Sequence, residues 1–282
     1  MSAFLVALLI TASTAFAVDT GGPARVIDEE ALAKRELAQA HAHADKILAF
    51  YARLPAAERI KVDAALKESI ISIEEWASRN ADTEFLCLGE RHGPGPREFL
   101  ETRFLPVYKP DALLLEDGPN IVSGFLTRAQ NGESGLTLKY ADISGVMRAA
   151  EKVGATVIGV DVEPGEAVAR EDQIFNRVLA ANKTAKKSVA LYGALHCSTV
   201  YGMFYSRMLA RSDRSSSMKS ITTESWNKPE AAGLQRFLSK LGYAATDFAI
   251  VDPTRFAESP LGKWFPKALY ALRGYDGAFV IP

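Results

Sequence analysis

Four short apolar runs in this chain each end in side chains that can carry a proton or bind a metal ion. Apolar runs of this length, bounded by turn residues, are typical of buried strands. In an open α/β sheet, ligands bind in the crevice outside the carboxyl ends of the strands. We therefore expect one fold to bring the ends of the four runs to a single rim. The runs are Phe85-Leu-Cys-Leu-Gly-Glu90-Arg-His92, Ala112-Leu-Leu-Leu-Glu116-Asp117, Thr156-Val-Ile-Gly-Val-Asp161 and Val189-Ala-Leu-Tyr-Gly-Ala-Leu-His196.

The surrounding pattern predicts an α/β fold with a mainly parallel sheet flanked by helices. From Asp82 onward, strand-like runs alternate with loops and helix-like segments, which is typical of such a sheet. Before it, Asp28 can cap a helix to about Leu54, and Pro55 can open a second helix to about Arg79. We therefore expect an N-terminal helical hairpin over residues 18–80 and an α/β domain over residues 81–282. Further helices are expected over 96–108, 144–153, 166–184, 199–209 and 232–241, and further strands over 219–223, 247–252 and 277–282.

The net charge and the first residues limit which partners the protein can bind and where it is located. The chain has 282 residues and a formal net charge of -1. It therefore lacks the excess of basic residues that would indicate binding to nucleic acid or to an anionic membrane. Residues 1–17 contain an apolar run and finish with Ala15-Phe16-Ala17, which is the pattern of a cleaved signal peptide and is too short to span a bilayer. We therefore expect an exported protein, periplasmic or secreted, with no transmembrane span after the signal is removed.

The chain has two cysteines, Cys87 and Cys197, which are too few for a disulfide scaffold. An exported protein would allow them to pair. Buried cysteines often act as small hydrophobic side chains, and we favour that interpretation over a disulfide bond.

The candidate site consists of carboxylates and histidines at the ends of the runs. Glu90 and His92, among the glycines of residues 89–95, can act as a general base with its orienting partner, or as two metal ligands. Glu116 is expected at the rim, and Asp161 is expected either there or as a cap on the following loop. We expect His196 to share a site with His92, although two independently packed histidines are the alternative. As a metal set, Glu90, His92, Glu116, Asp161 and His196 would suit Zn, Mn, Co or Fe.

Several familiar motifs are absent from the sequence. There is no Gly-x-Ser-x-Gly elbow, no Walker loop, no His-Glu-x-x-His and no Gly-x-Gly-x-x-Gly after a strand. Serine hydrolases, P-loop and dinucleotide-binding proteins, and zincins therefore lose their usual support.

Short motifs in a consistent order give the chain a family resemblance over about residues 82–282. They are Leu88-Gly89-Glu90-Arg91-His92-Gly93, the run ending in Glu116, the helix with Asn176 to Asn182, Gly193-Ala194-Leu195-His196 and the closing Tyr275-Asp276-Gly277-Ala278-Phe279. In these motifs the chain resembles the superfamily that unites erythromycin esterases, ChaN-type haem-uptake proteins and the Tiki/TraB/GumN group (EreA/ChaN-like). The resemblance implies that Glu90, His92, Glu116 and His196 are the catalytic or ligand residues.

Two positions depart from the family pattern. The helix motif Arg-Asp/Asn-x-x-Met-Ala is replaced by Phe175-Asn-Arg-Val-Leu-Ala180, so Phe175 stands where the family has arginine. Arg177 lies on the same helix but faces another direction, because residues two apart do not share a helix face. In the Gly-Ala-Gly-His form of the histidine motif, Leu195 replaces the second glycine.

These observations favour an exported hydrolase, esterase-like or peptidase-like, acting on a small-molecule or peptide substrate. His92 or Glu90 would activate water, alone or through a divalent metal. Water bound to such a metal has a pKa of about 7. Glu116 and His196 would complete the site. The alternative is a non-enzymatic haem- or metal-binding uptake protein of ChaN type, with Tyr192 or Tyr201 as extra contacts. A third hypothesis is a degenerate member that serves as a structural or host-interaction module.

Overall fold

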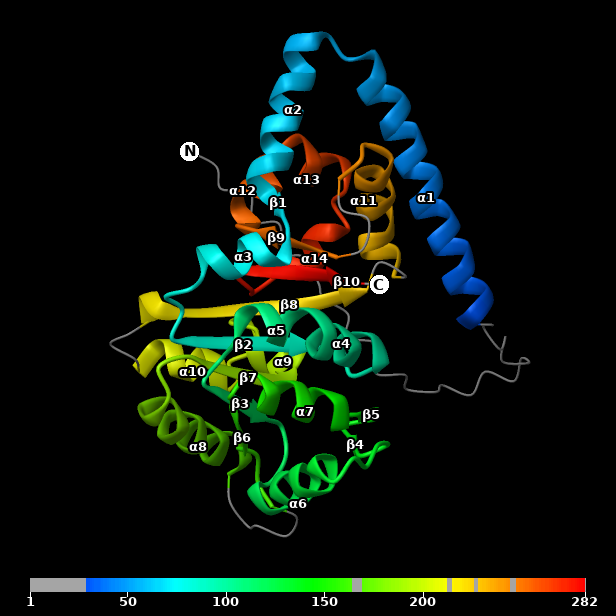
Figure 1. Cartoon of the computed structure of the whole chain (residues 1–282). Helices are drawn as coiled ribbons and strands as arrows, with labels where there is room; N and C mark the ends of the chain where they lie inside the picture. The colour runs from blue at the N-terminus through cyan, green and yellow to red at the C-terminus, as the bar shows by residue number, and fades with distance from the viewer. Residues whose placement is uncertain (1–28, 164–168, 212–214, 226–227, 244–246, 282) are drawn as a thin grey trace, which may run out of the picture.

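The chain is built around one large sheet with helices on both faces (Figure 1). The computed structural model describes residues 29–163, 169–211, 215–225, 228–243 and 247–281. The sheet has eight strands in the order β1-β9-β10-β8-β2-β7-β3-β6. This architecture confirms the predicted α/β class. The signal peptide expected over residues 1–17 lies outside the described residues.

The four apolar runs form four neighbouring parallel strands. They are β2 (Phe85–Glu90), β7 (Ser188–Gly193), β3 (Ala112–Leu115) and β6 (Thr156–Gly159). Because the strands are parallel and adjacent, their carboxyl ends meet at one edge of the sheet, as the sequence predicts. The remaining strands are β8 (Met218–Ser225) and β10 (Gly277–Ile281), which continue the parallel set, and β9 (Phe248–Val251) and β1 (Ile70–Ile71), which pair antiparallel.

Alternate residues along each strand are buried against different helices, as the strand period of two requires. On one face, Leu86, Leu113 and Phe279 share a core with α3, α5 and α7. On the opposite face, Phe85 and Leu114 pack against α8 and α10. The helices of the first face are α3 (Ile73–Arg79), α4 (Pro94–Phe99), the π-helical turn η1 (Leu100–Phe104), α5 (Leu105–Tyr108), α6 (Pro119–Gln130) and α7 (Ser144–Lys152), and those of the second are α8 (Arg170–Thr184), α9 (Ala194–Cys197) and α10 (Phe204–Arg211).

The N-terminal helix pair packs on the other half of the sheet, around β9 and β10. Helix α1 (Glu29–Arg53) lies beside α11 (Pro229–Lys240), and Arg236 pairs with Asp45 across them. None of the described helices is long and apolar enough to cross a membrane. The same core includes α2 (Ala56–Ser69), α12 (Pro253–Glu258), α13 (Pro260–Trp264) and α14 (Ala268–Leu272), and a short 3-10 turn, η2 (Ser215–Ser217), precedes β8.

The second N-terminal helix is shorter than predicted, because sheet pairing interrupts it. The expected helix to Arg79 ends at Ser69, and Ile70 and Ile71 pair with β9. Isoleucine is β-branched and fits a strand well, so the available edge of β9 outweighs the helical pattern. Ser72 then caps α3 by accepting a hydrogen bond from the Glu75 amide at 3.1 Å.

The segment 118–140 contains α6 and half of a small hairpin. This hairpin consists of β4 (Thr137–Leu138) and β5 (Ala141–Asp142). Its two turn residues, Lys139 and Tyr140, have φ values of 46° and 73°. Both central residues of a type I′ turn need positive φ, which explains the conformation of these non-glycine residues.

Candidate active site

The structure gathers the predicted residues at the carboxyl edge of β2, β7, β3 and β6. Glu90 ends β2, Glu116 directly follows β3, and Asp161 lies just beyond β6; all three carboxylates are buried. His92 and His196 are both within 4 Å of Glu116, at 3.9 Å and 3.8 Å. Asp161 joins them through Arg170, which contacts both Asp161 and Glu116. The expected convergence at one rim is therefore what the structure shows.

Glu90 and His92 form the first histidine–carboxylate pair. Nδ1 of His92 lies 2.9 Å from Oε1 of Glu90, and Arg97 of α4 donates to the same oxygen at 2.5 Å. An ionised carboxylate only accepts hydrogen bonds, so it places the His92 hydrogen on Nδ1 and leaves a lone pair on Nε2. Burial lowers the pKa of Arg97, and the charges of Glu90 and Glu116 oppose that shift.

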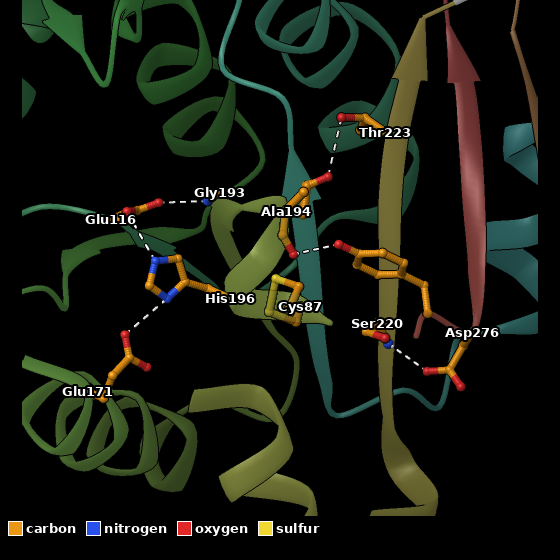
Figure 2. The surroundings of a disulfide bond; sticks show 12 residues. Cys87, Glu116, Glu171, Gly193, Ala194, His196, Ser220, Thr223 and Asp276 are labelled. Atoms are coloured by element: carbon orange, nitrogen blue, oxygen red, sulfur yellow. Dashed lines mark hydrogen bonds and ion pairs between the residues drawn. A yellow bond between two sulfur atoms is a disulfide. The ribbon is translucent and has the colours of Figure 1, made fainter. Parts of the chain in front are cut away.

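His196 belongs to a second pair that the sequence did not reveal. Its Nδ1 lies 3.2 Å from Oε1 of Glu171, in the first turn of α8. Its Nε2 lies 3.4 Å from Nη1 of Arg170, and a guanidinium can only donate. His196 therefore carries its hydrogen on Nδ1 as well, but Nδ1 and Glu171 are only within ion-pair distance and do not form a hydrogen bond. Figure 2 shows the ring held between Glu116 and Glu171.

Glu116 lies between the two imidazoles and is fixed by the backbone of β7. Its Oε2 accepts a hydrogen bond from the Gly193 amide at 2.6 Å (Figure 2). A Cβ at Gly193 would lie only 3.1 Å from Nε2 of His92 and 3.4 Å from Oε2 of Glu116. The absent side chain of Gly193 thus lets the histidine and the carboxylate approach the strand end closely.

Arg170 supplies a guanidinium that binds two of the acids. Its Nη2 donates to Asp161 at 2.5 Å and to Glu116 at 2.9 Å. Burial acts to raise the pKa of Asp161, but hydrogen bonds from Arg170 and the Val162 amide, with the charges of Arg170 and Lys139, outweigh it and lower the pKa. The hydrogen bond to Asp161 raises the pKa of Arg170, so both groups stay charged.

Phe175 stands where the family has arginine, but Arg170 on the same helix, α8, brings a guanidinium to the site. Phe175 is buried in the core against α10 and Arg211, whereas Arg170, on the first turn of the same helix, reaches the site. Arg177 donates to the backbone oxygen of Asp161 and so supports the loop after β6. A positive charge is therefore present at the site although Phe175 provides none.

Cys87 and Cys197 form a disulfide bond, which corrects the expectation of two unpaired buried side chains (Figure 2). Both residues lie near the site, but sequence alone does not give the distance between two Cα atoms, which is 5.4 Å here. The bond joins the middle of β2 to the short helix α9. It therefore connects the strand that ends in Glu90 to the turn that carries His196.

A cavity of about 600 Å³ opens onto these groups. Its lining includes the reacting groups Glu90, His92, Glu116 and His196, together with Tyr201 and Glu224. Tyr201 is exposed, whereas Tyr192 is fully buried beneath His196, where burial raises the pKa of its hydroxyl. Of the two tyrosines expected to contact a ligand, only Tyr201 is therefore accessible from the cavity.

The predicted metal set does not fit a shared ion in this arrangement. Arg170 lies between Glu116 and Asp161, where a cation bound by both carboxylates would have to be. Among the residues that the structure describes, no group of three or more histidine, cysteine, aspartate or glutamate side chains is placed to hold a metal ion.

Sequence reasoning missed Arg97, Arg170, Glu171 and Glu224. Glu224 had a usable signal, because it follows the β-branched run of β8 and so repeats the pattern of a strand that ends in an acid. Its Oε1 lies 3.4 Å from Nε of Arg91. The other three lie on helices, where a charged side chain usually indicates a solvated face.

Comparison with known proteins identifies no family for this chain. No protein-family model matches it, and no curated protein matches it. A solved structure described as that of the type III effector HopBA1 is similar over 54% of this chain and 83% of that chain, with a TM-score of 0.38 and 13% sequence identity. With so low a score, this likeness indicates neither a shared fold nor a shared function.

Proposed function

We propose that this protein is a hydrolase that cleaves esters of small molecules with water activated by His92. One observation carries the proposal: two histidine–carboxylate pairs, Glu90–His92 and Glu171–His196, face the same buried carboxylate, Glu116, in an open cavity. A histidine oriented by a carboxylate is a frequent general base. A volume of about 600 Å³ is in the range of small-molecule sites. The family resemblance of the sequence motifs agrees with this assignment.

His92 is the better placed base of the two histidines. Its side chain is 24% exposed, whereas that of His196 is 12% exposed. Glu90 holds the hydrogen on Nδ1, so the lone pair of Nε2 points toward Glu116 and the cavity. A water that donates one hydrogen to Nε2 and the other to Glu116 would be oriented by both groups.

In the reaction, the water oxygen bonds to the ester carbonyl carbon as Nε2 of His92 takes a proton. The carbonyl electron pair moves to its oxygen, which carries the negative charge of the tetrahedral intermediate. When the pair returns, the bond from carbon to the alcohol oxygen breaks. That oxygen takes the proton back from His92, which leaves a carboxylic acid, an alcohol and the starting enzyme.

The experiment measures hydrolysis of p-nitrophenyl esters by the purified chain and by matched histidine variants. We expect His92→Ala to lower kcat/KM by about 10²–10⁴-fold. His41→Ala, on α1, is the control and should match the wild type. Thermal unfolding of each variant checks that it is folded. Ester hydrolysis that is absent in the wild type, or unchanged in His92→Ala, would contradict the proposal.

Haem binding is the second candidate function, and the exposure of Tyr201 beside two histidines favours it. Phenolate and imidazole are both known axial ligands of haem iron. A hemin titration tests this function. A saturable shift of the Soret band that is lost in Tyr201→Phe would support it, and an unchanged spectrum would exclude it.

A further inference from the structure

Exposed apolar side chains gather at the rim of the candidate active site. Among the residues that the structure describes, six large hydrophobic side chains are strongly exposed, and four of them border this site. They are Tyr140 at 89%, Leu195 at 53%, Val200 at 49% and Tyr201 at 58% exposure. The other two, Phe50 and Ile60, lie on the N-terminal helices. Single exposed hydrophobic residues are ordinary, but a group beside convergent polar residues marks a ligand site.

Three of the four side chains line the same cavity as the reacting groups. Leu195, Val200 and Tyr201 share it with His92 and Glu116. Leu195 directly precedes His196, so one short turn presents both an apolar and an imidazole side chain. Tyr140 is not part of this lining, but its ring centre lies 6.4 Å from that of His92. The apolar surface is thus continuous with the site where bond cleavage is proposed.

The segment that carries this apolar surface is held at both ends. The hydroxyl of Tyr275 donates to the backbone oxygen of Ala194 at 2.6 Å. The Thr199 amide donates to the backbone oxygen of Gly274 at 2.9 Å, and the Val200 amide donates to Oγ of Ser198 at 3.2 Å. A surface fixed before binding loses little conformational entropy when a ligand arrives. These contacts favour a binding surface over a loosely placed loop.

Each acidic side chain that lines the cavity is paired with an arginine. Glu90 pairs with Arg97, Glu116 with Arg170, and Glu224 with Arg91. A cationic substrate group would have to compete with these arginines for the carboxylates; Arg273, which also lines the cavity, adds one positive charge to it. An uncharged apolar group meets no such competition at Leu195, Val200 and Tyr201.

We infer that the substrates are esters whose acyl group is an uncharged, apolar chain of several carbons that lies on Leu195, Val200 and Tyr201. This inference rests on the proposed ester hydrolysis and adds the substrate class to it. Each methylene buried on this surface in the transition state raises kcat/KM by about fourfold. The increase stops where the chain becomes longer than the surface.

The test compares p-nitrophenyl acetate, butyrate and hexanoate, which share one leaving group. We expect kcat/KM to rise along the series in the wild type. Leu195→Ser and Tyr201→Ser should each flatten that rise. Ile60→Ser is the matched control, since it removes an exposed hydrophobic side chain from α2, and the rise should persist.

Each outcome separates the two proposals. Hydrolysis with equal kcat/KM for all three esters would overturn the apolar substrate class but leave the hydrolase in place. Hydrolysis of none of them would contradict the hydrolase. In that case, binding of the uncharged fluorophore N-phenyl-1-naphthylamine tests whether the apolar surface binds apolar groups. Loss of binding in Leu195→Ser but not in Ile60→Ser supports such a surface. Equal binding by both variants overturns it.

Discussion

Each of the two histidine–carboxylate pairs of the site joins an imidazole to a glutamate, but the pairs differ in how far apart their residues lie in the sequence. Glu90 and His92 are two residues apart at the end of one strand. Glu171 and His196 come from different helices, α8 and α9, and meet only when both helices pack beside β7. The first pair is therefore a local feature of the sequence, whereas the second is a product of tertiary structure. Each feature that holds α9 should accordingly affect His196 more than His92.

The largest expected effect concerns the shared action of the two histidines. If both serve one reaction, His92→Ala and His196→Ala each remove most of the activity, about 10²-fold or more, and the double variant loses little beyond either single variant. Steady-state kcat/KM for the three variants measures this. Losses that multiply as for independent sites would show that the two pairs act separately.

Removing the disulfide bond should weaken the fold and disturb the second pair. The bond spans a sequence separation of 110 residues. A cross-link over so long a loop typically contributes about 2–4 kcal/mol to the free energy of unfolding. We expect Cys87→Ala, Cys197→Ala double variants to unfold at lower urea concentration and to shift the NMR signals of His196 more than those of His92.

Dithiothreitol provides the control for this prediction. It should lower the unfolding midpoint of the wild type and leave that of the double variant unchanged. A wild-type midpoint that does not respond to the reductant under unfolding conditions would contradict a stabilising bond.

Glu171 should act by positioning His196, with a smaller effect than either histidine. We expect Glu171→Ala to lower kcat about tenfold, because the imidazole loses the negative charge that lies 3.2 Å from its Nδ1. Glu171→Gln keeps an acceptor oxygen and should lose less. The NMR tautomer signature of His196 distinguishes this role from general destabilisation. Asp172→Asn, next to it on the same helix and exposed, is the matched control.

The smallest expected effect concerns Tyr275, whose hydroxyl supports α9 through the backbone oxygen of Ala194. Tyr275→Phe should lower the free energy of unfolding by about 0.5–1.5 kcal/mol at neutral pH. Burial, with the charge of Glu224, raises the pKa of Tyr275 from 10.0 to about 12. A raised pKa stabilises the fold fully below the unfolded value, and this contribution is lost as pH rises through the folded value.

The difference in stability between the wild type and Tyr275→Phe should therefore decline between about pH 10 and pH 12. Urea unfolding at a series of pH values measures it. Tyr140→Phe, which alters an exposed ring, is the control. Parallel pH profiles for the wild type and Tyr275→Phe would contradict the expected contribution.

The contrast between local features and features formed by tertiary packing also explains how much of the structure the sequence could predict. The strand-end residues Glu90, Glu116, Asp161 and His196 follow apolar runs whose length and composition already indicate buried parallel strands. The edge of the sheet that carries the site was therefore predictable. The hydrolase assignment and the exported location stay predictions.

The missed parts depend on packing that no local pattern encodes. Arg97 and Glu171 lie on helices. A charged side chain on a helix is predicted to face solvent, and only the packing of the helix on the sheet shows otherwise. Ile70 fits both the apolar face of a helix and a strand, and only the neighbouring edge of β9 decides between them. Pairing of Cys87 with Cys197 likewise depends on a distance that exists only in the folded chain.

The position of β2 has a consequence for synthesis on the ribosome. Its two neighbours in the sheet, β7 and β8, both lie far downstream, after β3 and β6 have been made. During elongation, this fully buried strand therefore has both hydrogen-bonding edges unpaired. A nascent chain that ends before Ser188 exposes the apolar run of β2 with neither partner strand present, so it should depend on chaperones or aggregate. Release of residues beyond Ser225 would end that requirement.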